Sequence, residues 1–363
     1  MTILQLISSR RVYGAEKVTL ILSKGLQQKG LKVILGIMDH FEEENELESA
    51  ALKEGLEVKR IVTRRQIDPK ALNHLRQLIK TYSPHLIHSH NYKSNFYASL
   101  SKTSRQRWIL TAHTWCGTDL KTKCYDTLDR ILIRFADAVV AVSLNILEEL
   151  AQWRVPKPKC FYIPNALECP VKAPHALDET FTVGFVGRLE KEKNIKVVTQ
   201  ALIQFLAHHK DSQALILGDG SLRPWVQNLI QEHGLQKRIL LLGKVPAQEM
   251  KNYYQKIDCL FLPSLREGLP MVVLEALCFG IPIVGSARAL KDVGEKPFTR
   301  IIKAPHQTKQ AVSQSVKFLT ELREMYQNKE AFLRLSQLAQ KEAQKFNTSS
   351  MVNKYFDLYQ KLL

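Results

Sequence analysis

Short apolar runs alternate with helical patterns along most of the chain. In the first half, strand-like runs occupy positions 1–8, 32–37, 86–88, 108–111 and 138–142, and a helical pattern covers 15–28. Parallel strands need a crossover connection, which a helix usually provides. The alternation therefore predicts a parallel sheet that is covered by helices on both faces.

The alternation restarts in the second half. Strand-like runs occupy 181–186, 214–217, 239–242, 259–262 and 282–285, and helical patterns cover 195–208, 223–233, 247–256 and 270–279. Prolines are dense between 156 and 174, where neither a helix nor a central strand can continue. We therefore expect two doubly wound α/β halves in series, an N-terminal domain at 1–165 and a C-terminal domain at 181–345, joined by a linker at 166–180.

The tail carries apolar side chains on one helical face, at Met351, Tyr355, Leu358, Tyr359 and Leu362. This pattern predicts a final helix within 346–363, and we expect it to pack back on the N-terminal domain. A length of 363 residues is about twice that of a usual single domain, in agreement with two domains.

Composition excludes several classes of protein. Hydrophobic residues make up 45% and charged residues 24%, as in soluble globular proteins. There is no run of about 18 apolar residues, and the opening run 1–7 is too short and uncharged for a signal peptide, so we expect a cytoplasmic protein without a membrane span. The six cysteines are scattered without a C-x-x-C pair, and we expect reduced thiols.

The formal net charge of +17 favours anionic partners such as nucleic acid, anionic lipid or phosphorylated substrates. Part of the excess lies in the basic segment 59–65, followed by a helical pattern whose apolar stripe comprises Leu72, Leu75, Leu78 and Ile79. This helix either lies on a membrane surface or packs its stripe on the sheet with solvated charges outside. The second interpretation is favoured.

Candidate chemistry follows the strands of the second half, because ligands of open α/β sheets bind beyond the carboxyl ends of the strands. After 181–186 come Gly187, Arg188 and Lys193, just before a helix. A glycine that lets the backbone approach and two cations above a helix N-terminus suit a diphosphate. In isolation the segment also fits a charged surface turn.

The next loop reads Gly218-Asp219-Gly220-Ser221 and only partly matches a dinucleotide fingerprint. Position 223 is Arg where a third glycine would stand, and an acidic residue for the ribose is absent about twenty residues further on. We therefore do not expect NAD.

The most specific pattern is E-G-L-P-M-V-V-L-E-A, which begins at Glu267. Glu267 precedes a helix, and Glu275 lies about two turns into it. Backbone amides at the helix start would face a ligand, with the helix dipole favouring its negative part. Carboxylates accept hydrogen bonds from vicinal hydroxyls of a ribose or hexose. The residues of this helix start are Gly268, Leu269, Pro270 and Met271.

Together with Gly187-Arg188-Leu189, Lys193-Asn194 and Gly218-Asp219-Gly220, this run resembles family 4 of the retaining glycosyltransferases. The resemblance covers nearly the whole chain. It implies the GT-B fold, in which two Rossmann-like domains face each other across a cleft, and a nucleotide-diphosphate sugar as donor. It also implies that Glu275 holds the ribose, Glu267 sits beside the donor sugar, and Arg188 and Lys193 neutralise the diphosphate.

The resemblance extends to the first half. Gly14 matches a Gly-rich loop that the family places close to the donor phosphates, although Arg10 and Arg11 stand where glycines are common. His113 matches a histidine beside the reacting centre. The expected catalytic residues are His113, Glu267, Arg188 and Lys193, and the expected donor site adds Gly14, Gly187, Gly218 and Gly220.

The acceptor side is expected at His90, Asn91 and Lys93, which follow a strand. We expect His88 and His90 on opposite faces of that strand, so that one is a core residue and the two do not form a metal pair. The chain has no D-x-D motif, and neither a metal nor another cofactor is expected.

The chain departs from the family after Gly285, where it reads Ser286-Ala287-Arg288-Ala289-Leu290-Lys291-Asp292 in place of a Gly-Gly-x-x-Glu stretch. This departure leaves open that the chain is a degenerate, inactive member of the family. The resemblance implies attack on the face that the diphosphate leaves, with the leaving phosphate helping to take the acceptor proton. A hexose would pass to a lipid-linked or saccharide acceptor, as in surface polysaccharide, lipopolysaccharide or glycolipid assembly at the inner face of a membrane.

Two other functions remain open. The first is a nucleotide-sugar epimerase or a phosphorylase on the same fold. The second is a polyanion-binding protein without catalysis, which only the charge of +17 supports. Nucleic acid is not an expected partner, because helix-turn-helix, RNP-like and zinc patterns are absent.

Overall fold

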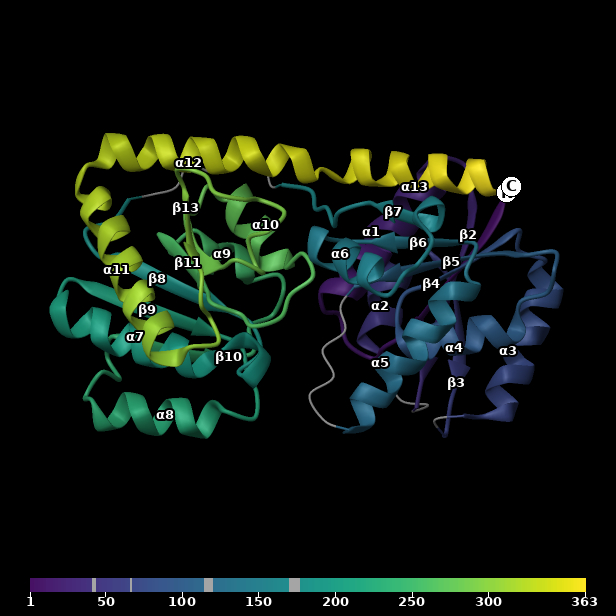
Figure 1. The fold of residues 1–363 in the computed structure, drawn as a ribbon, viewed down its shortest axis with the longest axis horizontal. Helices are drawn as coiled ribbons and strands as arrows, with labels where there is room; N and C mark the ends of the chain where they lie inside the picture. The colour runs from purple at the N-terminus through teal and green to yellow at the C-terminus, as the bar shows by residue number, and fades with distance from the viewer. Residues whose placement is uncertain (41–43, 66, 114–119, 170–176) are drawn as a thin grey trace. The chain divides into compact units, whose positions relative to one another are not determined.

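The computed structural model describes residues 1–40, 44–65, 67–113, 120–169 and 177–363 (Figure 1). They form two compact units. Unit 1 comprises Met1–Leu167 together with Asn347–Leu363, and unit 2 comprises Glu168–Phe346. The expected linker at 166–180 lies partly outside the described residues.

Unit 1 is built on a parallel sheet with the strand order β3-β2-β1-β4-β5-β6-β7. From β1 the chain proceeds toward one edge of the sheet and from β4 toward the other, so the topological switch point lies between β1 and β4. The strands are β1 (Thr2–Ser8), β2 (Lys32–Asp39), β3 (Glu57–Val62), β4 (Leu86–Ser89), β5 (Arg107–Ala112), β6 (Ala138–Ala141) and β7 (Cys160–Tyr162). The helices are α1 (Gly14–Gln28), α2 (Glu46–Lys53), α3 (Pro69–Tyr82), α4 (Tyr92–Ser101), α5 (Leu120–Leu132), η1 (Ile133–Phe135), α6 (Leu144–Gln152), η2 (Lys157–Lys159) and α13 (Thr348–Leu362).

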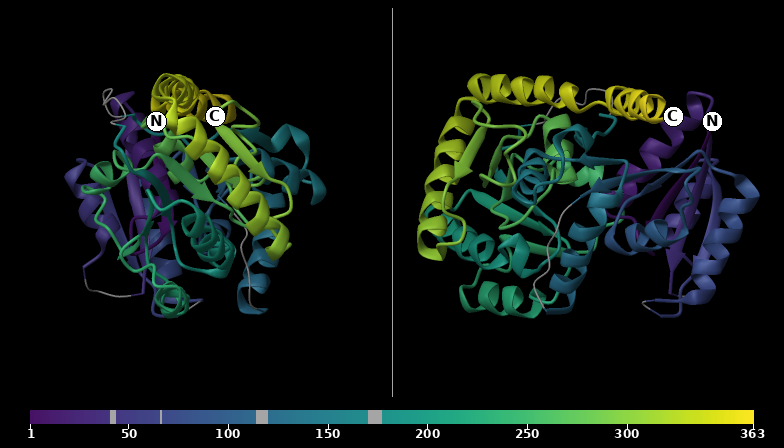
Figure 2. Two further views of the ribbon diagram at one scale, coloured as in Figure 1. Left: turned by 90° about the vertical axis from the view of Figure 1, so that its left-hand side faces the viewer. Right: turned by 45° about the vertical axis from the view of Figure 1, so that its right-hand side comes forward.

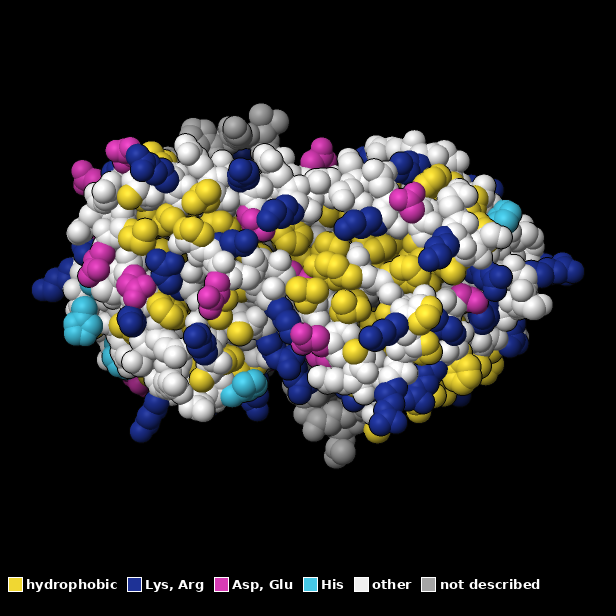
Figure 3. Space-filling view, turned by 45° about the horizontal axis from the view of Figure 1, so that its top comes forward, with side chains coloured by type: hydrophobic (Ala, Val, Ile, Leu, Met, Phe, Trp, Pro, Cys, Tyr) yellow, Lys and Arg dark blue, Asp and Glu magenta, His cyan; other side chains and the backbone are white. Residues whose placement is uncertain are grey.

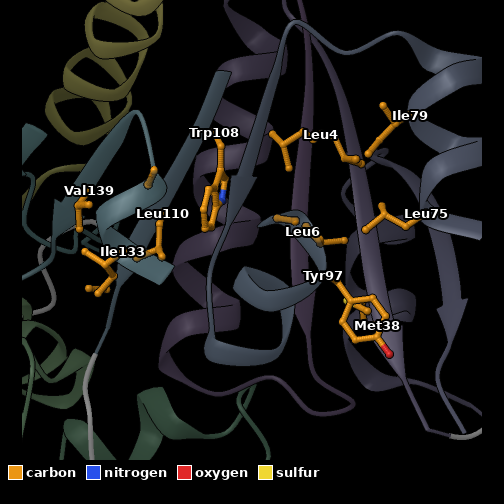
Figure 4. Close-up of a cluster of buried hydrophobic side chains, with 14 of the residues drawn as sticks. Leu4, Leu6, Met38, Leu75, Ile79, Tyr97, Trp108, Leu110, Ile133 and Val139 are labelled. Carbon is orange, nitrogen blue, oxygen red and sulfur yellow. The ribbon is translucent and has the colours of Figure 1, made fainter. Parts of the chain in front are cut away.

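The apolar stripe of α3 packs on the sheet. Asp68 caps the helix N-terminus, with its side chain accepting hydrogen bonds from two first-turn amides. Leu75 and Ile79 are buried in the cluster that contains Leu4 and Met38 (Figure 4). This confirms the core-packing interpretation of the 72–79 stripe.

The basic segment 59–65 includes most of an edge strand, β3, which the sequence pattern did not predict. Five of the six side chains of β3 are only half-buried. Arg60 lies 3.5 Å from a carboxylate oxygen of Asp39 and 3.3 Å from one of Glu48. Part of the basic charge is therefore paired with acids of unit 1.

Helix α13 belongs to unit 1, as expected for the tail. Met351, Tyr355, Leu358 and Tyr359 are buried on its inner face. Its Val352 lies against α1 at Gly25, where an added Cβ would stand 2.4 Å from a Val352 methyl group. The final helix therefore packs back on the N-terminal sheet domain (Figure 2).

Unit 2 is a second parallel sheet, with the order β10-β9-β8-β11-β12-β13 and its switch point between β8 and β11. Both halves are therefore doubly wound, as predicted. The strands are β8 (Phe181–Val186), β9 (Ser212–Leu217), β10 (Ile239–Gly243), β11 (Cys259–Leu262), β12 (Ile283–Ser286) and β13 (Thr299–Ile302). The helices are η3 (Lys191–Lys193), α7 (Ile195–His208), α8 (Arg223–Glu232), α9 (Met250–Tyr254), α10 (Met271–Cys278), α11 (Thr308–Gln327), α12 (Lys329–Ala343) and η4 (Gln344–Phe346).

The expectation of reduced thiols is wrong for one pair. Cys169 and Cys278 form a disulfide with a Cα–Cα distance of 5.2 Å, across a sequence separation of 109 residues. The bond ties the segment that opens unit 2 to the last residue of α10. Cys124, Cys160 and Cys259 are free thiols.

Within the described ranges, no helix is both long enough and apolar enough to cross a bilayer. On the face shown in Figure 3, lysine and arginine side chains are scattered among apolar ones.

Candidate functional site

The loops after β8 and β11 meet at the switch point of unit 2. The two strands are neighbours, with Cys259 in register with Val183. The Leu265 amide donates to the Glu192 carbonyl at 2.8 Å. Asn194 has a left-handed backbone, φ 56°, and its side-chain amide donates to the Pro263 carbonyl at 3.1 Å. These bonds fix the position of one loop against the other.

Lys193 and Glu267 form an ion pair across this junction. The Lys193 Nζ lies 2.5 Å from Glu267 Oε1, and the side chains are only 16% and 9% exposed. The structure therefore brings together two residues that the sequence places 74 positions apart. A cation held at the carboxyl ends of β8 and β11 is suitably placed for an anionic ligand, and the adjacent carboxylate is a hydrogen-bond acceptor.

Arg188 remains accessible on the same loop. Its side chain is 58% exposed, and one guanidinium nitrogen donates to Glu192 Oε1 at 2.6 Å. An exposed ion pair of this kind contributes little to stability, so the guanidinium can change partner at little cost.

Gly218 and Gly220 serve loop packing. Gly218 has φ +137°, and a Cβ there would stand 1.9 Å from the Gly187 carbonyl oxygen. A Cβ on Gly220 would stand 2.6 Å from the Leu189 carbonyl oxygen. The Glu190 carboxylate accepts hydrogen bonds from the amide and the hydroxyl of Ser221, at 2.8 and 2.6 Å. The two glycines thus let the loop after β9 lie directly on the loop after β8.

Helix α10 begins directly after the Glu267-Gly268-Leu269-Pro270 run. Its N-cap is Pro270, which provides no side-chain hydrogen bond, and the first helical residue is Met271. An N-terminus without a side-chain cap presents backbone donors and the positive end of the helix dipole. Leu269, Pro270 and Met271 are buried, so they shape the backbone there rather than expose side chains.

Glu275, in the second turn of α10, is oriented by Tyr254 of α9. The Tyr254 hydroxyl donates to Glu275 Oε2 at 2.6 Å. Burial raises the pKa of Tyr254 well above 10, and the Glu275 carboxylate adds to the rise, so the hydroxyl stays protonated. Tyr254 was not expected in the site, because a tyrosine at the end of a short helix belongs to no sequence motif.

The departure after Gly285 forms a compact turn. The Ser286 hydroxyl donates to the Ser264 carbonyl at 2.6 Å and accepts from the Ala289 amide at 3.2 Å. Ser286 therefore ties the end of β12 to the loop that leads to Glu267.

In unit 1, the loops after β1 and β4 likewise meet at a switch point. Asn91 caps α4 and also donates from Nδ2 to the Ser8 carbonyl at 2.8 Å. Gly14 is the first residue of α1, and Arg10 Nε donates to the Glu44 carbonyl at 3.2 Å. The sequence placed Gly14 and Asn91 in these two loops, and the structure joins the loops through Asn91.

Three histidines cluster at the carboxyl ends of β4 and β5, where His88 and His90 are buried and His113 is half-buried. The ring centroids of His88 and His90 are 4.2 Å apart, and those of His90 and His113 are 5.8 Å apart. The expectation that His88 and His90 face opposite sides is wrong, because residues two apart on a strand share a face.

The C-terminal helix supplies partners to this cluster. His88 is hydrogen-bonded through Nδ1 to the Tyr359 hydroxyl and through Nε2 to the Thr111 hydroxyl, both at 2.6 Å. His90 Nε2 donates to Gln5 Oε1 at 2.6 Å. Tyr359 and Thr111 were not identified as site residues from the sequence.

Burial keeps the three imidazoles neutral. It lowers the pKa of His88 to about 3, with a further contribution from His113, and that of His113 to about 4. Burial also lowers the pKa of His90 well below 6.5. Within the described residues, His90 Nδ1 and His113 Nε2 are buried without a hydrogen-bond partner. They can therefore hydrogen-bond a ligand or water.

Lys93 contacts different residues from His90. Its amine donates to the Thr63 hydroxyl at 2.6 Å and lies 3.2 Å from His40 Nε2. Burial lowers the pKa of Lys93 to about 8, against the opposing effect of Asp39 and Asp68. The acceptor roles of His90, Asn91 and Lys93 stay predictions.

The described part of the chain places no three His, Cys, Asp or Glu side chains together in a way that could hold a metal ion.

Two family descriptions match successive parts of the chain. Residues 12–169 match Glycosyltransferase Family 4, and residues 171–338 match Glycosyl transferases group 1.

Curated relatives carry related names. The chain is 26% identical over 216 residues to the lipopolysaccharide 1,6-galactosyltransferase of Salmonella typhimurium, covering 58% of each protein. It is 25% identical over 224 residues to an uncharacterised glycosyltransferase of Methanocaldococcus jannaschii, covering 56% of this chain and 57% of the relative. The chain thus spans less than two thirds of the length of these relatives.

Solved structures share the fold over the full length. Anabaena HepE in complex with UDP has a TM-score of 0.81 at 17% identity, covering 99% of this chain and 100% of HepE. A glycosyltransferase from Rickettsia africae has a TM-score of 0.80 at 19% identity, covering 99% and 98%. With the two matched regions and the paired doubly wound sheets, these likenesses lead to one conclusion. The chain belongs to the glycosyltransferases that combine a Glycosyltransferase Family 4 region with a Glycosyl transferases group 1 region, and it has the GT-B fold.

Proposed function

We propose that this glycosyltransferase moves a hexose from a nucleoside-diphosphate sugar to an acceptor with retention of anomeric configuration. The observation that carries the proposal is the Lys193–Glu267 pair at the switch point of unit 2, beside the uncapped start of α10. Solved structures of similar fold are described in complex with UDP and with UDP-glucose. Binding of a nucleotide-sugar donor at the switch point of unit 2 is the simplest use of these groups.

Lys193 and Arg188 bind the diphosphate in this proposal. A phosphate oxygen competes with Glu267 for Lys193, so donor binding replaces an internal ion pair with a charge-assisted hydrogen bond to the ligand. Glu267 is then released to accept from a hydroxyl of the donor sugar. Arg188 exchanges Glu192 for the second phosphate.

Glu275 accepts from the ribose hydroxyls, and Tyr254 fixes the carboxylate for that role. A carboxylate can accept several hydrogen bonds at once, so Glu275 can accept from Tyr254 and from a ribose hydroxyl together. The α10 amides and the two cations together stabilise the charge that grows on the leaving diphosphate.

In this proposal the acceptor hydroxyl attacks the sugar from the face that the diphosphate leaves, and the reaction requires neither a carboxylate nucleophile nor a metal. The leaving phosphate takes the acceptor proton as the new glycosidic bond forms. His113 acts as a neutral hydrogen-bonding group toward the reacting sugar, in agreement with the lowered pKa of its imidazole. Chelator should therefore leave the rate unchanged.

The acceptor in this proposal is a lipid-linked saccharide at the inner face of a membrane, in polysaccharide or glycolipid assembly. Support comes from the similarity to a lipopolysaccharide galactosyltransferase and from the net charge of +17. If no nucleotide binds, the alternative function is binding of polyanions without catalysis.

The donor site is tested by calorimetric titration of the protein with a panel of nucleoside diphosphates. We expect one base to bind, with Lys193→Met and Glu275→Gln each weakening binding about 10- to 100-fold, because each removes a hydrogen bond to a charged group. Glu232→Gln, an exposed glutamate on α8, is the matched control and should bind as the wild type. Equal affinity in Lys193→Met and the control would sink the assignment.

A further inference from the structure

A stripe of exposed apolar side chains runs along α5 and η1 in unit 1. Leu128, Ile131 and Phe135 are 39%, 52% and 65% exposed, and Cys124 is an exposed free thiol. The four residues are spaced four, three and four apart, which places them on one side of the helix. A surface helix normally directs such a stripe at the core.

The opposite side of α5 fixes the helix on unit 1. Asn95 Nδ2 donates to Asp129 Oδ1 at 2.6 Å, and the Tyr125 ring stacks on Tyr92 with centroids 5.0 Å apart. Ile133, in η1, is fully buried in the core cluster (Figure 4). These contacts fix which side of the helix faces unit 1. The apolar stripe therefore lies on the outer side of a helix that is already packed on its inner side.

Basic side chains border the stripe. Arg134 is exposed next to the stripe, and its guanidinium donates to the Trp153 carbonyl at 3.2 Å. Lys159 donates to the Ala136 carbonyl at 3.0 Å, one residue beyond Phe135. Lys157 is exposed in the same short helix as Lys159. Asp129, by contrast, is buried on the inner side.

Exposed apolar patches on soluble domains mark interaction surfaces. An apolar stripe bordered by cations is the pattern of a helix that lies in the interface of an anionic membrane. Side chains such as Phe135 enter the boundary between headgroups and acyl chains, while arginine and lysine meet lipid phosphates. The cations beside the stripe attract an anionic lipid surface, whereas they would repel the same cations on a second copy of the chain. An anionic membrane is therefore the favoured partner.

We propose that the outer face of α5 and η1 docks on an anionic membrane surface. The inference deepens the proposed function, because it names the surface where a lipid-linked acceptor would be met. It replaces α3, whose apolar stripe is buried, as the membrane-contacting helix. Vesicle binding does not depend on sugar transfer, so either proposal can fail without the other.

The test is co-sedimentation of the full chain with phosphatidylcholine vesicles, with and without phosphatidylglycerol. We expect binding to the mixed vesicles. Ile131→Ser with Phe135→Ser should lower the partition coefficient about 100-fold, or about tenfold for each large apolar side chain removed. Because both residues are exposed, the variant should keep the wild-type circular dichroism and unfolding midpoint.

The charged border is tested by Arg134→Gln with Lys157→Gln. We expect about fivefold weaker binding for each cation removed, on vesicles that contain phosphatidylglycerol only. Leu333→Ser with Leu338→Ser, which removes two exposed leucines from α12, is the matched control and should bind as the wild type.

Two outcomes would overturn the proposal. The first is wild-type binding by the Ile131/Phe135 variant. The second is a wild-type dimer in light scattering that becomes a monomer in that variant without any vesicle binding by the wild type, which would assign the stripe to a second copy of the chain.

Discussion

The polar side chains of both sites are held by partners that are distant in the sequence. Lys193 meets Glu267 across 74 positions, and Tyr359 reaches His88 across 271. The motifs identified Lys193, Glu267 and Glu275, because spacing along one segment is visible in a sequence. The partners Tyr254 and Tyr359 were missed, because a pattern along the chain contains no information on which helix packs beside which loop.

The buried histidines make the stability of unit 1 depend on pH. The pKa of His88 is about 3 in the folded chain and near 6.5 when unfolded. Between these values the unfolded chain binds one proton more than the folded chain at this residue. Lowering the pH through this window therefore favours unfolding, by about 1.4 kcal/mol per pH unit for His88 alone.

We expect His88→Gln to reduce this pH dependence by that amount. The free energy of urea unfolding of wild type and variant would be compared at about pH 5.5 and about pH 4.5, which both lie between the two pKa values. The loss of hydrogen bonds shifts the variant equally at both pH values, so the difference between slopes isolates the titration. Identical slopes would show that His88 is protonated in the folded chain.

At the scale of elements, prediction succeeded where both faces of a strand are buried. β8 and β11 lie at the predicted positions, because a continuous apolar run leaves neither face of the strand for solvent. β3 and β13 were missed because charged residues interrupt their short apolar stretches: Glu57, Lys59 and Arg60 in β3, and Arg300 in β13. The Cys169–Cys278 disulfide could not be predicted, since two cysteines 109 residues apart meet only in the fold.

The packing of the loop after β9 on the loop after β8 gives a prediction for Gly218. Gly218→Ala should lower the free energy of unfolding by about 2–4 kcal/mol, because its Cβ would overlap the Gly187 carbonyl at a positive φ. Gly234→Ala is the matched control, with φ +66° and open space around the added Cβ, and should cost only about 1 kcal/mol. Thermal unfolding measures both; equal losses would mean that φ alone accounts for the glycine.

At the scale of the molecule, the two units follow one plan. Each has a doubly wound parallel sheet, and in each the candidate site residues follow the carboxyl ends of strands at or next to the switch point. This plan follows from the alternation of short apolar runs and helices, and the family match agrees with it. The two sites explain only part of the net charge of +17. The cations that border α5 contribute another part, and their proposed role is to bind anionic lipid.

The central claim is that the Lys193–Glu267 junction binds the diphosphate of a sugar donor during transfer. The most direct test follows release of nucleoside diphosphate from a panel of nucleotide sugars, with a membrane lipid extract as acceptor, for wild type and Lys193→Met. We predict that one donor is consumed in an acceptor-dependent reaction and that the variant is at least about 100-fold slower, from the loss of charge stabilisation in the transition state. Consumption of that donor at the same rate by both proteins would contradict the account.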